Sequence, residues 1–157
     1  MPERIRTVED AKGIVEERKL THVKIGLIDI DGIMLGKYMS RNKFFSALDH
    51  GFSFCDVILG WDSKDKLFDN VKYTGWHTGY PDALVRILPQ SCRELVFEDN
   101  QLLFMAEFDG AAAELCPRGV LRRVIQKAEM MGFDAYAALE YEFRAMQLTN
   151  LTTTYSV

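Results

Sequence analysis

Residues 21–39, with the sequence THVKIGLIDIDGIMLGKYM, carry the clearest secondary-structure pattern of the chain. Residues 21–30 alternate in polarity and are rich in β-branched side chains, a pattern that predicts a strand. Asp31-Gly32 follows, the dipeptide that most strongly favours a tight hairpin, and residues 33–39 return as the partner strand. The stretch therefore predicts an antiparallel hairpin.

A helix is expected on each side of this hairpin. Residues 7–19 form an amphipathic pattern, with Thr7 as a candidate N-cap and acidic side chains in the first turn. After the hairpin, Ser40 is a suitable N-cap for a helix through His50, and Gly51 is placed to end it. The apolar side of this second helix would pack across the hairpin.

The remaining pattern completes a mixed α+β fold. Further strands are predicted at residues 83–88 and 101–108, with a turn at 98–100. A hairpin, a helix packed across it and further strands together predict a β-grasp (ubiquitin-like) arrangement. Residues 55–82 contain aromatic and glycine residues with little periodicity, which indicates a functional loop and argues against disorder.

The pattern changes near residues 110–113, where we expect a domain boundary. A helix follows over residues 118–131, opened by Pro117 and closed by Gly132. Its solvent face is expected to carry Arg118, Arg122 and Arg123. The expected units are an N-terminal helical segment at 1–20, the β-grasp domain at 21–111, and the start of a second domain at 112–157.

The last distinctive stretch is FDAYAALEYEF at residues 133–143. As a strand it would place Glu140 and Glu142 on one face, because side chains two residues apart point the same way. Two adjacent carboxylates repel each other, and a hard divalent cation such as Mg²⁺ would offset that repulsion. A solvated face of an antiparallel sheet is the alternative interpretation of the same spacing.

Composition and charge exclude several classes of protein. The chain has 157 residues, of which 48% are hydrophobic and 27% charged, as is typical of a globular protein. A net charge of −4 without a basic cluster argues against a nucleic-acid partner. No apolar run approaches the roughly 18 residues of a membrane span, and the N-terminus lacks a signal-peptide core, so a cytoplasmic location is expected. Free thiols are expected at Cys55, Cys92 and Cys116.

Short motifs in a fixed order connect residues 23–143 to a known family. They are DIDG at 29–32, GKY at 36–38, LGWD at 59–62, GYPD at 79–82, CPR at 116–118 and EYEF at 140–143. Each is weak alone, but in this order they resemble the glutamine synthetase family. The words around residues 75–82, GWHTGYPD, are more similar to its glutamine-synthetase-like and γ-glutamyl-amine ligase branches.

This resemblance implies a specific chemistry. Family members place an N-terminal β-grasp domain before a larger catalytic domain and assemble as homo-oligomers, usually of two stacked rings. They use ATP to activate the γ-carboxylate of glutamate, which ammonia or an amine then attacks, with Mg²⁺ or Mn²⁺ bound near the phosphates. By resemblance, Glu140 and Glu142 are metal ligands, and residues 112–157 are the truncated start of the catalytic domain.

Two departures from the family pattern limit this expectation. The family's Asp-Gly-Ser-Ser loop, whose aspartate reaches the neighbouring ammonium pocket, is replaced by FCDVILGW at residues 54–61. Asp56 is the candidate catalytic residue there, Asp62 is a second, and either could equally be a loop acid that caps backbone N–H groups. The family's remaining metal ligands and nucleotide pocket have no counterpart in the sequence, so we expect a catalytically incomplete N-terminal part of a ligase. The alternative is a non-catalytic β-grasp module that docks on or regulates a full-length ring. The identity of the amine stays open.

Overall fold

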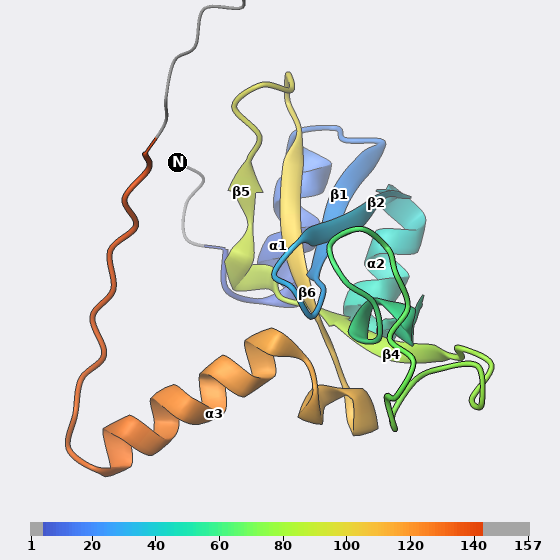
Figure 1. The fold of residues 1–157 in the computed structure, drawn as a ribbon. Helices are drawn as coiled ribbons and strands as arrows, with labels where there is room; N and C mark the ends of the chain where they lie inside the picture. The colour runs from blue at the N-terminus through green and yellow to red at the C-terminus, as the bar shows by residue number, and fades with distance from the viewer. Residues whose placement is uncertain (1–4, 143–157) are drawn as a thin grey trace, which may run out of the picture.

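The computed structural model describes residues 5–142, which form a mixed helix and sheet structure (Figure 1). One six-stranded sheet has the order β2-β1-β6-β4-β3, and β5 pairs with β6. The strands are β1 (His22–Ile28), β2 (Met34–Ser40), β3 (Phe52–Cys55), β4 (Asp82–Ile87), β5 (Arg93–Glu94) and β6 (Leu102–Phe108). The α-helices are α1 (Val8–Glu17), α2 (Arg41–His50) and α3 (Pro117–Met130), and the short 3₁₀ helices are η1 (Asp56–Leu59), η2 (Pro89–Ser91) and η3 (Gly110–Glu114).

The predicted hairpin is confirmed as the antiparallel pair β1–β2, in which Gly26 lies opposite Gly36. Its turn is one residue longer than Asp31-Gly32 alone. Asp29 Oδ1 accepts hydrogen bonds from the backbone of Ile33 at 2.7 Å and of Asp31 at 3.0 Å. Gly32 adopts a φ of 86°, the conformation that a three-residue hairpin loop requires. The buried Asp29 carboxylate therefore sets the length of this turn.

Strand β6 is the centre of the fold, since it pairs in parallel with β1 and antiparallel with β4. Every residue of β6 is buried. Helices α1 and α2 contact each other, and both contribute side chains to the core. In that core the ring of Phe44 on α2 lies 4.8 Å from the ring of Phe104 on β6, centroid to centroid. Burial between α2 and β6 thus joins the helical layer to the sheet.

The helix ends follow the sequence in most respects. The side chains of Thr7 and Asp10 form a complete capping box at the start of α1, which confirms Thr7 as its N-cap. Gly51 ends α2 with a φ of 76°, also as predicted. Ser40 occupies the N-cap position of α2, but its side chain makes no capping hydrogen bond. The backbone N–H of Arg41 donates instead to Thr21 O at 2.8 Å, so the sheet takes over part of the cap's role.

Three differences from the predicted elements concern short or unpaired segments. Strands β3 and β5 were not predicted, because four and two residues are too few for a periodic pattern. Residues 133–142 form no strand, because no neighbouring strand among residues 5–142 offers them a ladder of hydrogen bonds. The strand prediction for this segment is wrong over the described residues, and Phe143 lies outside them. No helix in the described part of the chain has both the length and the apolar composition to cross a membrane.

Candidate functional site

The irregular segment after β3 is organised around a buried carboxylate. Asp56 opens η1 and is only 2% exposed. Its Oδ1 accepts a hydrogen bond of 2.5 Å from the hydroxyl of Thr74, which is itself 1% exposed. The backbone N–H of Asp56 donates to Pro81 O at 3.0 Å. Two points of the loop that are distant in sequence are therefore tied to one residue.

The second oxygen of this carboxylate is not consumed by the protein. No described residue donates a hydrogen bond to Asp56 Oδ2, and this oxygen is not among the fully buried side-chain atoms that lack a partner. One such buried atom lies in the same loop, the indole nitrogen of Trp61. Asp56 Oδ2 can therefore accept a donor from a ligand.

A phenol lies close to this carboxylate. Burial raises the pKa of the Tyr73 hydroxyl, and the negative charge of Asp56 raises it further. The phenol therefore stays protonated near neutral pH and remains a hydrogen-bond donor. Asp56, Thr74 and Tyr73 give the site one anion surrounded by neutral hydroxyl groups.

The outer part of the loop presents aromatic side chains. Trp76 is 83% exposed and meets Tyr80 edge to face, with ring centroids 5.4 Å apart. His77 Nε2 lies 3.1 Å from Lys72 O, so this imidazole is satisfied by the local backbone. The sulfur of Cys55 donates to Tyr80 O at 3.4 Å, which brings the aromatic end of the loop back to the strand before Asp56.

Asp62, the second acid considered for this region, has a different role. Its Oδ1 accepts hydrogen bonds from the backbone of Lys64 at 2.9 Å and of Lys66 at 3.0 Å. The backbone bonds from Lys66 and Lys64 hold the pKa of Asp62 below its usual value. Asp62 therefore caps its own turn, the loop-acid role that the sequence left open for either residue.

The predicted metal ligands lie far along the chain from this loop, after α3. Glu140 and Glu142 are exposed and make no hydrogen bond or ion pair with any residue between 5 and 142. Within that same range no three His, Cys, Asp or Glu side chains gather closely enough to hold a metal ion. The described residues thus supply the two carboxylates without the other ligands of a closed site.

The acid that sequence inspection missed is Glu107, on the central strand β6. It is 7% exposed, and its two oxygens accept hydrogen bonds from Arg118 Nε at 2.9 Å and from Arg122. The Glu107 carboxylate in turn raises the pKa of Arg122. The prediction that these arginines only cover the solvent face of α3 is wrong, because both bind Glu107. Their spacing of four residues, which puts them on one side of a helix, was the available signal.

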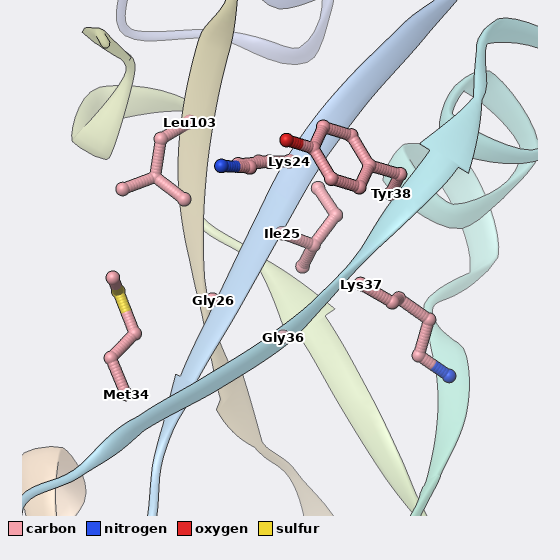
Figure 2. A pocket seen from close by; sticks show the side chains of 8 residues that line it. All are labelled: Lys24, Ile25, Gly26, Met34, Gly36, Lys37, Tyr38 and Leu103. Atoms are coloured by element: carbon pink, nitrogen blue, oxygen red, sulfur yellow. The ribbon is translucent and has the colours of Figure 1, made fainter. Parts of the chain in front are cut away.

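A separate shallow pocket lies on the outer face of the hairpin (Figure 2). Its volume is about 240 Å³, and Gly26 and Gly36 form its floor, where no side chain projects. Met34 and Leu103 stand on one side, and the phenol of Tyr38 lies beside the amine of Lys24 at the other. None of the predicted catalytic or metal residues lines this pocket.

Comparison with known proteins gives consistent results for sequence and fold. No protein-family model matches the chain. It is 44% identical over 128 residues to a type-1 glutamine synthetase of Dictyostelium discoideum, a match that covers 80% of this chain and 25% of that protein. It is 34% identical over 139 residues to a glutamate–isopropylamine ligase of Pseudomonas, covering 84% of this chain and 30% of the ligase.

The fold agrees with these relatives. A solved structure of GmaS with ADP superimposes with a TM-score of 0.57 at 17% identity, over 77% of this chain and 26% of that one. The chain thus spans between 25% and 30% of the length of these two curated relatives. It belongs to the glutamine synthetase family.

Proposed function

We propose that this chain is the N-terminal part of a ligase that uses ATP to join ammonia or an amine to the γ-carboxylate of glutamate. The observation that carries the proposal is the 44% identity to a glutamine synthetase together with 34% identity to a glutamate–amine ligase, each over at least 80% of the chain. Because these relatives are three to four times longer by coverage, glutamate, ATP and the amine are proposed for the whole protein.

Glu140 and Glu142 are the residues that we propose as ligands of Mg²⁺ or Mn²⁺. Both are carboxylates, the donor type that hard cations prefer, and both are exposed and free of protein partners within the described range. About six oxygen ligands are needed for Mg²⁺, so other residues, water or substrate must complete the site. A bound cation would supply neutralisation of phosphate charge. We infer that the described residues alone are catalytically incomplete.

Asp56 is the residue that we propose for the amine pocket. Its carboxylate is held in one orientation by Thr74 and leaves Oδ2 free to accept an N–H donor. A fixed carboxylate with one open oxygen suits an ammonium or amine group. The exposed Trp76 and the half-buried Tyr80, whose rings meet edge to face, lie on the same loop and would shape the entrance.

The architecture and setting of the protein are part of the same proposal. The parallel central pair β1 and β6, the hairpin partner β2 and the helix α2 packed across them support a β-grasp assignment. We propose this domain at 21–111, after a helical segment at 1–20 and before the start of the catalytic domain at 112–157. For the whole protein we propose a homo-oligomer of two stacked rings in the cytoplasm.

A chimeric ligase tests the proposal. Residues 5–142 would replace the matching segment of the Pseudomonas glutamate–isopropylamine ligase, and phosphate release would be followed with glutamate, ATP, Mg²⁺ and either isopropylamine or ammonia. We expect activity in the chimera and none in the isolated chain. Glu140→Gln and Glu142→Gln should each lower kcat about a hundredfold or more, because a lost ligand weakens charge neutralisation in the transition state. Glu129→Gln, on the exposed face of α3, is the matched control.

The amine site has its own readout in the same chimera. Asp56→Asn should raise KM for the amine more than it lowers kcat, whereas Asp62→Asn should change neither, because Asp62 caps its own turn. A folded, assembled chimera that turns over normally with both glutamates replaced would contradict the metal assignment. Binding of the isolated chain to a full-length ring, without any activity in the chimera, would favour the regulatory module instead.

A further inference from the structure

The β1–β2 turn, residues 29–33, lies against the loop that carries Asp56. The backbone N–H of Ile30 donates a hydrogen bond to Ile58 O at 3.2 Å. The backbone N–H of Ser63 donates to Asp31 Oδ2 at 2.7 Å, between residues that are 32 positions apart. The turn therefore holds the loop at two points, one before and one after Gly60.

Both points are close to the proposed amine-binding carboxylate. Ile58 is 1% exposed and belongs to η1, the four-residue helix that Asp56 opens. A Cβ on Gly60 would lie 2.7 Å from Thr74 Cγ2, so this glycine packs directly on the residue whose hydroxyl donates to Asp56 Oδ1. Because η1 is a single short turn, a shift of residues 58–63 would move Asp56 relative to its donor.

The turn is rigid enough to fix the loop. Asp29 is 2% exposed, and its Oδ1 accepts from the backbone of Asp31 and of Ile33. The backbone of Asp29 makes two further hydrogen bonds: its N–H donates to Ile33 O at 2.9 Å, and its carbonyl oxygen accepts from the N–H of Gly32 at 3.1 Å. Side chains that support a site through hydrogen bonds are most effective when they stand on such a rigid element.

Asp31 is the member of this turn whose side chain reaches the loop. It is exposed, and so is its hydrogen bond to Ser63. Water can solvate both groups when an exposed hydrogen bond is broken, so the fold should tolerate the loss. The segment between residues 56 and 63 would then open locally, without global unfolding. The contribution of Asp31 is thus to the position of the loop and not to the core.

We propose that Asp31 is a positioning residue for the amine site. Together with the backbone of Ile30 it holds residues 58–63, so that Asp56 stays against Thr74 and keeps Oδ2 open to an N–H donor. The inference rests on the proposed function, because it requires that Asp56 binds the amine. Asp31 acts through the backbone of the loop and needs no contact with substrate.

Hydrogen–deuterium exchange of the whole chain, read by mass spectrometry, tests the structural step without any activity. In Asp31→Ala, the amides of residues 57–63 should exchange about tenfold faster, whereas those of β6 should keep their rate. Asp31→Asn keeps a side-chain oxygen as acceptor and should restore most of the protection. Asp69→Ala is the matched control, because Asp69 is an exposed acid of the same irregular segment whose side chain bonds to no residue between 5 and 142. An unchanged exchange rate in Asp31→Ala, or the same change in Asp69→Ala, would overturn the proposal.

Steady-state kinetics of the chimeric ligase test the functional step. Asp31→Ala should raise KM for the amine about tenfold and leave KM for glutamate unchanged, with Asp31→Asn and Asp69→Ala close to the parent chimera. If Asp56→Asn raises KM for the amine while Asp31→Ala, with its loop released, does not, the positioning role alone is wrong. If Asp56→Asn has no effect either, the assignment of the amine site fails and this inference fails with it.

Discussion

Replacement of Thr74 by valine removes one hydroxyl group and keeps the shape of the side chain. In the folded protein that hydroxyl donates to Asp56 Oδ1 at 2.5 Å, and both residues are almost completely buried. The variant therefore leaves a buried carboxylate oxygen without its donor. This loss is more costly than the loss of an exposed hydrogen bond, because water cannot fully replace the missing partner.

The magnitude follows from the charge and the burial of the pair. A hydrogen bond to an ionised group contributes about 1.5–3 kcal/mol to stability. With Thr74 at 1% and Asp56 at 2% exposure, we expect Thr74→Val to lower the free energy of unfolding by about 2 kcal/mol. For a urea slope of about 2 kcal/mol/M, the unfolding midpoint should fall by about 1 M with the slope unchanged.

Urea titration at pH 7, followed by circular dichroism, measures this change, and a double-mutant cycle assigns it to the pair. The cycle adds Asp56→Asn and the combined variant, and we expect a coupling energy of about 1–2 kcal/mol. Thr21→Val, at an exposed position, is the control and should stay within about 0.5 kcal/mol of wild type. A coupling energy near zero would refute the conclusion that Thr74 anchors the loop through Asp56.

Three further measurements examine other parts of the molecule. Burial raises the pKa of the Cys92 thiol to about 11, so its alkylation rate, read by mass spectrometry, should rise only at strongly alkaline pH and stay low at pH 8. Hydrogen bonds, the strongest of them from Lys24, hold the pKa of Glu98 below its usual value of 4.5. The contribution of Glu98 to stability is therefore present above pH 4.5 and is lost as the pH falls through the lower pKa of the folded state. Glu98→Gln should flatten the acid side of the plot of unfolding free energy against pH. Gly51→Ala should lower the free energy of unfolding, measured by thermal melting, by about 1–3 kcal/mol, because φ is 76° and the new Cβ would lie 2.8 Å from the carbonyl oxygen of Val85 on β4. Gly13→Ala within α1 places its Cβ where no atom lies within 4 Å, so it should raise the same free energy by about 0.5–1 kcal/mol.

The sequence predicted those parts of the fold that depend on local chemistry. The Thr7 side chain caps the start of α1, and Gly51, with its backbone freedom, ends α2. The β1–β2 hairpin follows from the alternation of polarity on both sides of a turn dipeptide. Ser40 did not act as a cap, since a strand contact from Thr21 satisfied the first N–H of α2 instead. Neighbours distant in sequence decided that outcome, and no pattern within α2 could reveal them.

The candidate site was predictable only in its residue types. Asp56 was identified as an acid in the right loop, but its partner Thr74 comes from a segment 18 residues later that has no periodicity. Glu107 was hidden because a buried strand of apolar residues gave no reason to expect a paired acid. In both cases the missing information was a contact between separate segments, which depends on the complete fold.

The position of the acidic segment depends on the ion pairs at Glu107. Arg118 and Arg122 lie in the first half of α3, and their common bond to Glu107 joins that half of the helix to the central strand. The second half extends from this anchor with Val124 and Met130 exposed, and residues 133–142 follow it directly. The start of α3 is therefore held by Glu107 of β6 and by Arg123, which donates to Ala113 O at 3.2 Å and to Glu114 O at 2.7 Å, and Glu140 and Glu142 follow this helix without contacts of their own to residues 5–142. Because one carboxylate holds both arginines, a change at Glu107 should displace the proposed metal ligands without touching them, which makes this buried acid a positioning residue for the proposed chemistry.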